Sequence, residues 1–337
     1  MTGRDAEKQT FLARAGWGGA ARAHLAGDAS ARSYQRLRQG DRTAVLMDSP
    51  PGPGDDTADF LRIGAHLAGL GLSPPQVLEA EPDRGLLLLE DLGDALFTAV
   101  LQTDPGLEPD LYAAAVDVLL VLQQAAPPGA LADLSARDWA EAAGFAPQFY
   151  VAAATGTTPE AGRFTETLTQ ALSDHADAAR VLILRDYHAG NLIWLPDRSG
   201  AARVGLLDFQ QGQLGQPGYD LISLLQDARR DVAPETEAAG LARFAAGHGL
   251  RPEELAAGYA ILGAQRALRI IGIFARLCLV SGKPGYVALI PRVWAQLRRN
   301  LAHPALTALR TECLALLPEP TDETLNRIAA KCATLSP

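Results

Sequence analysis

Two short apolar runs that each lead to an aspartate constrain this chain more than any other feature. The first run, 181–184, is followed by Asp186, and Asn191 comes five residues after that aspartate. The second run, 204–207, leads directly into Asp208. Side chains at the ends of adjacent strands can meet around one small volume, and their oxygens are suitable ligands for Mg²⁺. The pattern predicts a site in which two of these groups hold a metal ion and the third accepts a proton.

This arrangement resembles the catalytic and metal-binding loops of the protein-kinase-like fold. Asp186 and Asn191 have the D-x-x-x-x-N spacing of the catalytic loop, and Asp208 with Phe209 matches the start of the metal-binding loop. The residues His-Ala-Gly-Asn at 188–191 are typical of the aminoglycoside phosphotransferase branch. The resemblance implies that Asp186 is the catalytic base and that Asn191 and Asp208 hold Mg²⁺ on the phosphates of ATP. The competing interpretation is an ordinary β-hairpin with solvated carboxylates in its turns.

Composition narrows the class of protein. The apolar content of 48% argues against disorder, and 337 residues suit one two-lobed domain or two modest ones. A net charge of −9 disfavours nucleic acid or an anionic membrane as the main partner. The start of the chain has no apolar signal core, and no apolar run approaches the roughly 20 residues of a membrane span. The three cysteines lack metal-ligand spacing, so we expect a protein of the reducing cytoplasm.

The amino-terminal part of the chain predicts a small antiparallel sheet with two helices. Helical apolar spacing occurs at 5–16 and at 57–70. The candidate strands lie at 21–26, 33–38, 42–47, 76–80 and 86–90. The turn between the first two strands contains Asp28, Ala29 and Ser30, whose small size lets backbone N–H groups approach phosphate oxygens. The resemblance implies that these residues bind the nucleotide, and the alternative is an ordinary polar hairpin loop.

The third strand departs from the family pattern. Kinase-like folds usually carry a lysine here that reaches the phosphates and pairs with a helix glutamate, whereas this chain has Met47. Arg32, Arg36 and Arg42 are the nearby candidates that could supply the missing positive charge. A nucleotide-binding pseudokinase without catalytic activity is therefore a competing interpretation.

A uniformly apolar strand at 86–89 ends in Glu90, Asp91 and Leu92, and the composition then changes from strand-like to helix-like. The resemblance implies that residues 90–92 form a hinge and bind the adenine edge. We therefore expect an α+β, bilobal protein-kinase-like fold. Its nucleotide-binding lobe, with a small antiparallel sheet, would comprise residues 1–92, and its mostly helical catalytic and substrate lobe would comprise residues 93–337.

The carboxy-terminal part is predicted to be helical around the catalytic stretch. The expected helices lie at 111–124, 139–154, 160–178, 253–280 and 286–301. The glycine-rich segment 210–217 is expected to be a loop that shapes a substrate pocket. The resemblance implies that Arg185 and Asp220 support the catalytic loop without touching the substrate.

Further motifs narrow the resemblance to the anomeric N-acetylmuramate/N-acetylglucosamine kinases of bacterial cell-wall recycling, which share a Leu-Met-Asp strand without the lysine. These motifs lie at 28–30, 45–51, 88–94, 184–192, 208–210, 219–225 and 272–277. The resemblance implies ATP-dependent phosphorylation of the C1 hydroxyl of an amino sugar. Arg266, Arg269 and Arg276, at helical spacing, are candidates to bind a substrate carboxylate, or they form internal salt bridges. His188 is a candidate to contact sugar hydroxyls or to hold its own loop.

Two other functions remain open at this point. One is a different small-molecule kinase of the same family, acting on an aminoglycoside, choline or a similar alcohol. The other is the pseudokinase, for which Met47 is the supporting feature. The expected partner is a small amino sugar, with no nucleic acid or membrane, and the expected state is a monomer.

Overall fold

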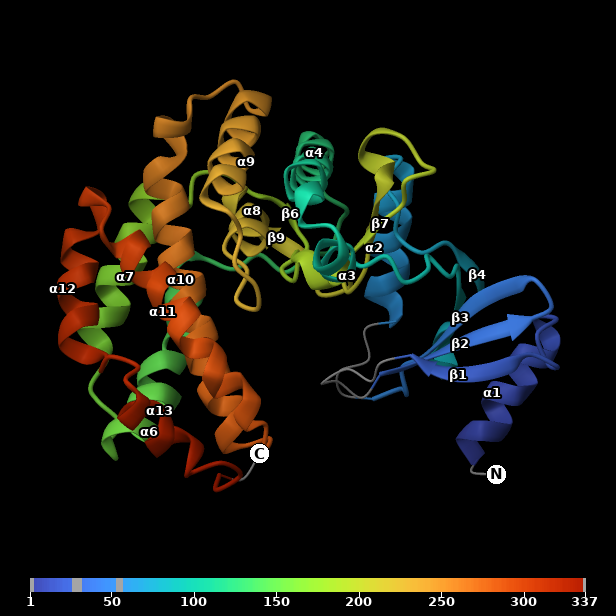
Figure 1. The fold of residues 1–337 in the computed structure, drawn as a ribbon, viewed down its shortest axis with the longest axis horizontal. Helices are drawn as coiled ribbons and strands as arrows, with labels where there is room; N and C mark the ends of the chain where they lie inside the picture. The colour runs from blue at the N-terminus through green and yellow to red at the C-terminus, as the bar shows by residue number, and fades with distance from the viewer. Residues whose placement is uncertain (1–2, 26–31, 53–56, 336–337) are drawn as a thin grey trace. The chain divides into compact units, whose positions relative to one another are not determined.

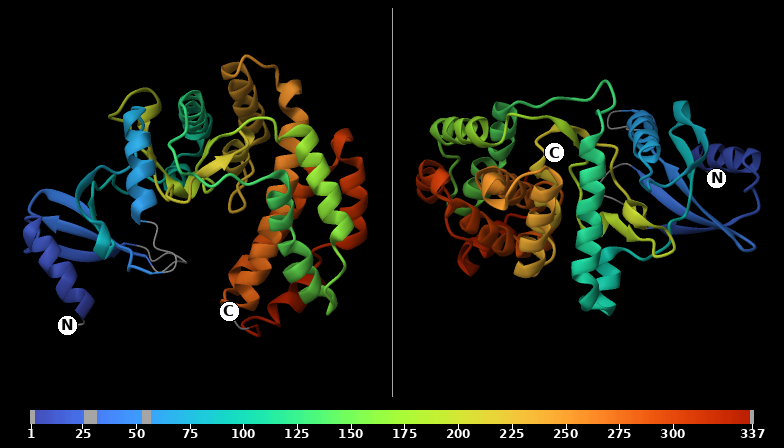
Figure 2. Two further views of the ribbon diagram at one scale, coloured as in Figure 1. Left: turned by 180° about the vertical axis from the view of Figure 1, so that it is seen from behind. Right: turned by 90° about the horizontal axis from the view of Figure 1, so that it is seen from above.

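The computed structural model describes residues 3–25, 32–52 and 57–335 of the chain. They form two compact units, shown in Figures 1 and 2. The sheet unit comprises Met1–Ala130 and Leu184–Gly212, and the helical unit comprises Leu131–Ile183 and Gln213–Pro337. The chain therefore passes between the units at three points. The predicted lobes, 1–92 and 93–337, divide the chain differently and stay a prediction.

The sheet unit is built on a five-stranded antiparallel sheet of order β1-β2-β3-β5-β4, which confirms the predicted α+β class. Its strands are β1 (Ala21–Leu25), β2 (Ser33–Gln39), β3 (Arg42–Asp48), β4 (Val77–Glu81) and β5 (Leu86–Leu89). Its helices are α1 (Gly3–Arg14), α2 (Thr57–Gly69), α3 (Phe97–Thr103) and α4 (Glu108–Gln124). Phe11 and Leu12 of α1 pack with Leu37, Leu46 and Leu88, so α1 covers one face of the sheet. Successive side chains of a strand alternate between faces, so the apolar pattern of β3 fits this packing.

A hairpin of β7 (Leu192–Trp194) and β8 (Val204–Leu206) completes the sheet unit. The sequence predicts it, because the apolar runs 192–195 and 204–207 lie on either side of a turn at 196–200. Two backbone bonds hold it in place. The Trp194 amide donates to the carbonyl of Ala95, and the Leu206 amide donates to that of Ser73 at 2.9 Å. The hairpin is therefore attached to the segments that follow α2 and β5, and the second of these carries the predicted hinge residues 90–92.

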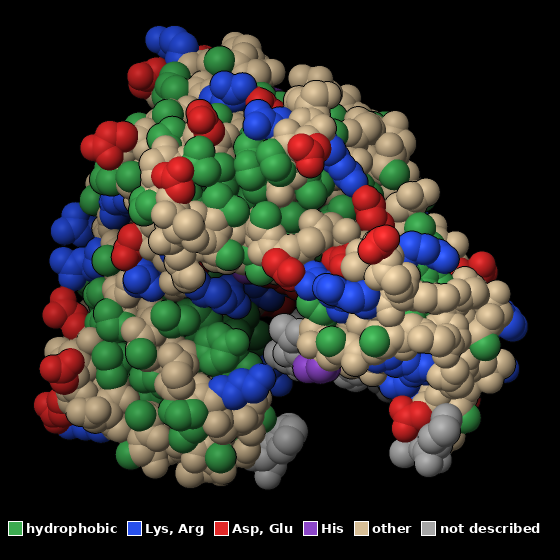
Figure 3. Space-filling view, turned by 45° about the vertical axis from the view of Figure 1, so that its right-hand side comes forward, with side chains coloured by type: hydrophobic (Ala, Val, Ile, Leu, Met, Phe, Trp, Pro, Cys, Tyr) green, Lys and Arg blue, Asp and Glu red, His purple; other side chains and the backbone are tan. Residues whose placement is uncertain are grey.

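The helical unit packs around the long helix α10 (Pro252–Leu279). The other helices are α5 (Ala136–Ala143), α6 (Ala152–Thr155), α7 (Gly162–His175), α8 (Gly218–Leu225), α9 (Pro234–Gly247), α11 (Ile290–Leu301), α12 (Thr307–Leu316) and α13 (Asp322–Ala329). At Gly272 the backbone of α10 approaches that of Phe145 so closely that a Cβ atom would overlap it. Lys and Arg side chains border a hydrophobic area on one face of this unit (Figure 3). None of the helices in the described ranges is both long and apolar enough to span a bilayer.

Two details of the helical unit correct the sequence predictions. The expected helix 139–154 is divided into α5, a π-helical segment (Ala146–Val151) and α6, because Pro147 has no N–H to donate to the preceding turn. The expected loop 210–217 contains β9 (Gln213–Gly215), which pairs antiparallel with β6 (Val181–Ile183). The first apolar run before Asp186 is therefore a strand, as predicted, but its partner is β9.

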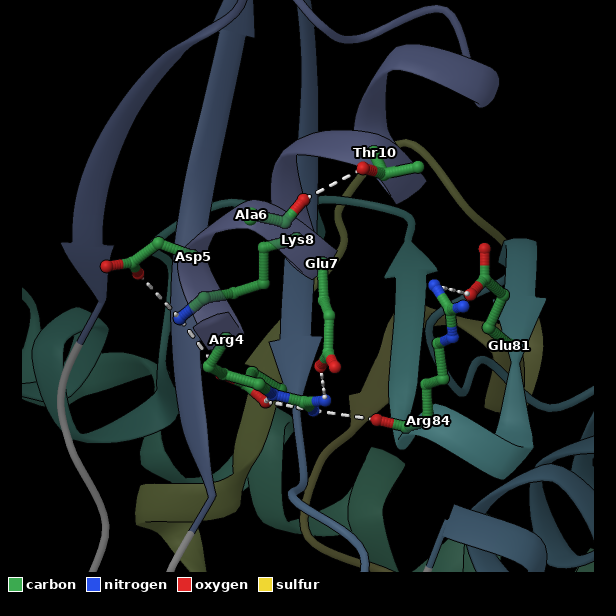
Figure 4. Close-up of polar contacts among 9 residues, drawn as sticks. Arg4, Asp5, Ala6, Glu7, Lys8, Thr10, Glu81 and Arg84 are labelled. Carbon is green, nitrogen blue, oxygen red and sulfur yellow. Dashed lines mark hydrogen bonds and ion pairs between the residues drawn. The ribbon is translucent and has the colours of Figure 1, made fainter. Parts of the chain in front are cut away.

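A buried ion cluster fixes α1 to the end of β3. Asp48 is 5% exposed, and its carboxylate accepts from Arg4 Nε at 2.9 Å and from Lys8 Nζ at 3.0 Å. Figure 4 shows that Arg4 also reaches Glu7 and the carbonyl of Arg84, at 2.9 Å and 2.7 Å. Leu46 packs against α1 and Asp48 lies two residues further on the same face, so this cluster lies on the α1 side of the sheet.

We predict that Asp48→Ala lowers the free energy of unfolding by about 3–5 kcal/mol, because it leaves two largely buried cations without their carboxylate. Urea unfolding at neutral pH measures this change. Asp5→Ala is the matched control, since Asp5 is the exposed partner of Lys8 at 3.7 Å. That control should change the stability by less than about 1 kcal/mol. Equal stabilities of the two variants would show that the buried cluster does not stabilise the fold.

Candidate active site

The hairpin places Asn191 and Asp208 side by side. β7 begins directly after Asn191, and β8 ends two residues before Asp208. Leu192 is opposite Leu206 in the ladder, and one more bond, from the Leu207 amide to the Asn191 carbonyl at 3.0 Å, extends the pairing beyond the strands. Both polar side chains therefore leave the same end of the hairpin, as the sequence pattern requires.

Asn191 also fixes the loop that carries Asp186. Its Nδ2 donates to the Asp186 carbonyl at 2.9 Å, and its backbone amide donates to the His188 carbonyl at 2.8 Å. The Asp186 carboxylate is partly exposed, and no residue in the described ranges donates a hydrogen bond to it or forms an ion pair with it. The amide of Asn191 is oriented by its donor group, so its Oδ1 is left available as an acceptor.

His188 is buried and serves its own loop. Its Nδ1 accepts the Gly190 amide at 3.2 Å, which caps the short 3₁₀ turn of residues 189–191. Its Nε2 lies 3.5 Å from Asn191 Nδ2. These contacts favour the loop-holding alternative for His188, and its contact with sugar hydroxyls stays a prediction.

Asp208 accepts two hydrogen bonds on a single oxygen. Gln210 Nε2 lies 2.6 Å and Arg32 Nη2 lies 3.0 Å from Asp208 Oδ1. The second carboxylate oxygen, Oδ2, accepts none from the residues that the structure describes. Gln210 is thus a direct neighbour of Asp208. The sequence analysis did not assign it to the site. Only its position two residues after Asp208, in the motif 208–210, could have indicated this contact.

The backbone is strained on both sides of this site. Arg185, which precedes Asp186, has a φ of 71°, and Asp208 has a φ of 55°. The left-handed region is costly for residues with a side chain, and such residues persist only where the surroundings enforce them. Two of the four non-glycine residues with positive φ in the described ranges therefore lie in the predicted catalytic loop and the predicted metal-binding loop.

Two buried aromatic side chains enforce these loops. Tyr187 follows Asp186 and donates its hydroxyl to the Ala115 carbonyl of α4 at 2.8 Å. Phe209 follows Asp208 and packs on Phe60 of α2, with ring centroids 4.8 Å apart. Each acidic residue of the site is thus followed directly by an aromatic residue that anchors its loop to a helix of the sheet unit.

The structure separates the three candidates for the missing strand cation. Arg36 binds Asp91 and Asp94, and its hydrogen bond to Asp94 holds the pKa of that carboxyl below its ordinary value. Arg42 lies over the ring of Trp17 at 4.5 Å. Of the three, Arg32 alone contacts the predicted site. Met47 is fully buried, and α2 contains no glutamate, so both partners of the usual lysine–glutamate pair are absent from these elements.

The predicted hinge residues are held by side-chain contacts. Glu90 binds Arg198 at 2.6 Å, Asp91 binds Arg36 at 2.9 Å, and the Leu92 side chain packs near Gly205. The Glu90 amide donates to the Gln76 carbonyl at 2.8 Å. Within the described ranges, the Glu90 carbonyl and the Leu92 amide have no protein partner. One backbone acceptor and one backbone donor, two residues apart, are therefore available to a ligand.

The remaining predicted residues are placed as follows. Asp28, Ala29 and Ser30 lie outside the described residues. Asp220 is fully buried in the first turn of α8, so its predicted support of the catalytic loop stays a prediction. Arg266, Arg269 and Arg276 all lie on α10 and are respectively buried, half-buried and exposed.

The donor set at the hairpin end fits Mg²⁺. Asn191 Oδ1 and Asp208 Oδ2 are oxygen atoms, the ligand type that this ion prefers. Mg²⁺ is commonly bound by one or two carboxylates together with substrate phosphates and water. No cluster of three His, Cys, Asp or Glu side chains suited to a metal occurs in the described part of the chain. The protein groups would therefore supply only part of the coordination, as in nucleotide-dependent enzymes.

Comparison with known proteins agrees with this geometry. The model of the phosphotransferase enzyme family matches residues 23–257. An N-acetylmuramate/N-acetylglucosamine kinase of Caulobacter vibrioides is 39% identical over 91% of this chain and 95% of its own length. A protein of the same name from Pseudomonas aeruginosa is 32% identical over 92% of this chain and 93% of its own length.

A solved structure shows a similar fold. The ADP-bound aminoglycoside phosphotransferase APH(2'')-Ib superposes with a TM-score of 0.55 at 16% identity, covering 82% of this chain and 92% of that one. The family match extends over more than half of the sequence, and the two relatives align with about nine-tenths of it. The motifs around Asp186 and Asp208 therefore predicted the family correctly, and the chain belongs to the phosphotransferase enzyme family.

Proposed function

We propose that this protein is an ATP- and Mg²⁺-dependent kinase that phosphorylates the C1 hydroxyl of N-acetylmuramate, N-acetylglucosamine or both, in peptidoglycan recycling. The observation that carries the proposal is the grouping of Asp186, Asn191 and Asp208 in a chain similar to kinases of that name along about nine-tenths of its length. We also propose that it acts as a monomer in the cytoplasm, where ATP is available.

Asp186 is the proposed proton acceptor. Its carboxylate is not bound by any described residue, so a substrate hydroxyl can donate a hydrogen bond to it. The C1 hydroxyl of a free sugar is more acidic than an ordinary alcohol, which makes a carboxylate a sufficient base. As the sugar oxygen bonds to the γ-phosphorus, the bond to the bridging oxygen of ADP breaks and the proton passes to Asp186. Such a loose transition state requires mainly alignment and neutralisation of charge.

Asn191 and Asp208 are the proposed ligands of Mg²⁺, through Oδ1 and Oδ2. When bound, this ion would neutralise charge on the nucleotide phosphates. The protein keeps the two oxygens in position by different means. Asn191 is fixed by its bond to the Asp186 carbonyl, and Asp208 is fixed by Gln210 and Arg32.

Arg32 is the proposed substitute for the missing strand lysine. Its guanidinium is almost fully buried and lies 3.0 Å from Asp208, so it adds a permanent positive charge beside the phosphate site. It also follows directly after the segment that contains Asp28, Ala29 and Ser30, the proposed phosphate turn. A charge from this position removes the need for a lysine at the buried Met47.

The hinge is the proposed adenine site. Adenine presents a donor amino group next to an acceptor ring nitrogen, which is the pattern that complements the Glu90 carbonyl and the Leu92 amide. These two backbone groups have no partner within the described residues, whereas the side chains around them are engaged. The ADP-bound structural relative supports a nucleotide site in this fold.

An end-point assay with ATP and Mg²⁺ tests the proposed function. The acceptors are N-acetylmuramate, N-acetylglucosamine, kanamycin and choline, and phosphorus NMR locates the new phosphate. We expect an anomeric sugar phosphate. If only kanamycin or choline gave a product, the protein would be a different small-molecule kinase of the same family and not an amino-sugar kinase. ATP binding without product from any acceptor would favour the pseudokinase.

We predict that Asp186→Asn keeps ATP binding and lowers kcat at least about 100-fold, because the amide cannot accept the proton. Steady-state kinetics and calorimetric titration with ATP measure the two effects separately. Asp197→Asn is the matched control, since Asp197 is an exposed aspartate in the turn of the same hairpin. A parallel loss of ATP binding and rate would instead assign Asp186 to the structure of the loop.

We predict that Arg32→Gln raises the KM for Mg·ATP about 10-fold or more, because it removes a charge-assisted contact at the phosphate site. Arg32→Lys should recover part of this loss, since it restores the charge but not the guanidinium fork. Arg42→Gln removes an arginine of the same sheet that lies on Trp17 and is the control. An unchanged KM in Arg32→Gln would contradict the assignment of Arg32.

A further inference from the structure

The hinge residues 90–92 belong to no helix or strand that would fix them. They lie between β5 and α3, and all three are half-buried. The Glu90 amide donates to the Gln76 carbonyl, whereas the Glu90 carbonyl and the Leu92 amide have no partner among the residues that the structure describes. A segment of this kind binds a ligand more tightly when other contacts already hold it in the bound conformation. The contacts of its side chains therefore decide how well it can bind.

Arg198 holds the first hinge residue from the side of the hairpin. It lies in the turn between β7 and β8, and its Nη2 is 2.6 Å from Glu90 Oε1. The other carboxylate oxygen, Oε2, accepts the Gln76 amide at 3.2 Å. The Glu90 side chain is therefore fixed between the turn of the hairpin and the segment before β4.

Arg36 holds the second hinge residue from the side of the sheet. Its Nε and Nη2 lie 2.9 Å and 3.0 Å from the two carboxylate oxygens of Asp91, and its Nη1 lies 2.7 Å from Asp94 Oδ2. A guanidinium that faces both oxygens of a carboxylate fixes its orientation as well as its position. Asp91 Oδ1 also accepts the Gly93 amide at 3.1 Å, which forms a local turn after Leu92.

Leu92 is held by close packing on the hairpin. A Cβ atom at Gly205 of β8 would lie 3.0 Å from Leu92 Cδ1 and 3.1 Å from Ile193 Cβ, so the glycine leaves the room that the Leu92 side chain occupies. Three consecutive hinge residues are thus held by three different contacts, and all of these contacts lie inside the sheet unit.

We propose that Arg36 and Arg198 are positioning residues for the nucleotide base. With their partners they form what we name the hinge clamp (Arg36, Glu90, Asp91 and Arg198). The inference rests on the proposed function, because it concerns the adenine site of that function. Neither arginine is assigned a contact with the base. The hinge clamp keeps the Glu90 carbonyl and the Leu92 amide in the conformation that the adenine edge requires, so ATP does not have to order this segment when it binds.

The hairpin thereby links the base to the metal ion. Its turn carries Arg198, and its opposite, open end carries Asn191 and Asp208. The separation between the adenine site and the metal site of one nucleotide is therefore set by a single hairpin. Loss of the Arg198 contact should disturb the base and leave the phosphates in place.

The test compares Mg·ATP with Mg·tripolyphosphate, which has the phosphates but no base, by calorimetric titration. Arg198→Met should weaken binding of Mg·ATP about 3- to 10-fold and leave that of Mg·tripolyphosphate within about 2-fold of the wild type. Arg198→Lys should recover part of the loss, since it restores the charge without the guanidinium fork. Arg14→Met is the matched control, because Arg14 forms an ion pair of the same length, 2.6 Å, with Glu81 of β4.

Arg36→Lys tests the other arm of the hinge clamp. It keeps a cation beside Asp91, whose side chain is only 7% exposed, and so avoids leaving that carboxylate unpaired. We expect the same selective loss for Mg·ATP. Equal losses for Mg·ATP and Mg·tripolyphosphate in Arg36→Lys or Arg198→Met would overturn the positioning role in favour of a general structural one.

A double-mutant cycle shows whether Arg198 acts through Glu90. Glu90→Gln removes the charge and keeps the backbone carbonyl. Glu90→Gln, Arg198→Met and the double variant should all weaken binding of Mg·ATP by similar factors, because each breaks the same contact. Additive losses would contradict the proposal, since Arg198 would then act on the nucleotide by itself.

Sugar phosphorylation separates the hinge clamp from the proposed function. In an active enzyme, the Arg198→Met and Arg36→Lys variants should raise the KM for Mg·ATP and keep kcat within about 2-fold. Activity with an unchanged KM in both variants would overturn the hinge clamp and leave the proposed function intact. A wild type that phosphorylates no sugar, but loses Mg·ATP affinity selectively in these variants, would reject the proposed function and support the hinge clamp. Equal affinity of the wild type for Mg·ATP and Mg·tripolyphosphate would reject the hinge clamp, because the base would then contribute nothing.

Discussion

Pairing of β7 with β8 is the interaction on which the rest of the candidate site depends. The ladder puts Leu192 opposite Leu206. One further bond, from the Leu207 amide to the Asn191 carbonyl, extends the pairing to the open end of the hairpin. A shift by one residue would turn Asn191 and Asp208 to opposite faces, because side chains alternate along a strand. The register is secured from outside by bonds to Ser73 and Ala95. The segments around Ser73 and Ala95 thus set the geometry of the polar end of the hairpin.

The sheet unit has two separate groups of charged side chains. One is the ion cluster around Asp48, and the other is the pair of Arg32 and Asp208 at the candidate site. The cations at Asp48 lie on the α1 side of the sheet, where they are enclosed with their carboxylate. The opposite side of β3 carries the buried Met47 in place of a lysine. Arg32, directly before β2, reaches Asp208 instead. A cation is therefore present beside the acidic site, but it comes from the residue before a neighbouring strand and not from the usual position.

The sequence predicted the features that depend on local patterns. The acidic motifs, the hairpin, the five-stranded sheet and the long helix α10 all follow from periodicity and spacing. It did not predict the pairing of β6 with β9, because strands of three residues have almost no periodic signal. The contact of Arg32 with Asp208 and that of Trp139 with Tyr219 join residues far apart in the chain. Such contacts depend on packing that no single segment encodes.

The sheet unit is discontinuous in the chain, and this has a consequence for how it can be made. Its second piece, Leu184–Gly212, supplies β7, β8 and all the acidic residues of the candidate site, and it is synthesised only after Leu131–Ile183. A ribosome therefore exposes the five-stranded sheet well before the hairpin that completes it. A gene fragment that ends at Ala130 would encode that sheet but neither Asp186 nor Asp208. Exchange of the helical unit between relatives therefore requires two insertions, one on either side of the hairpin, and not one cut between domains.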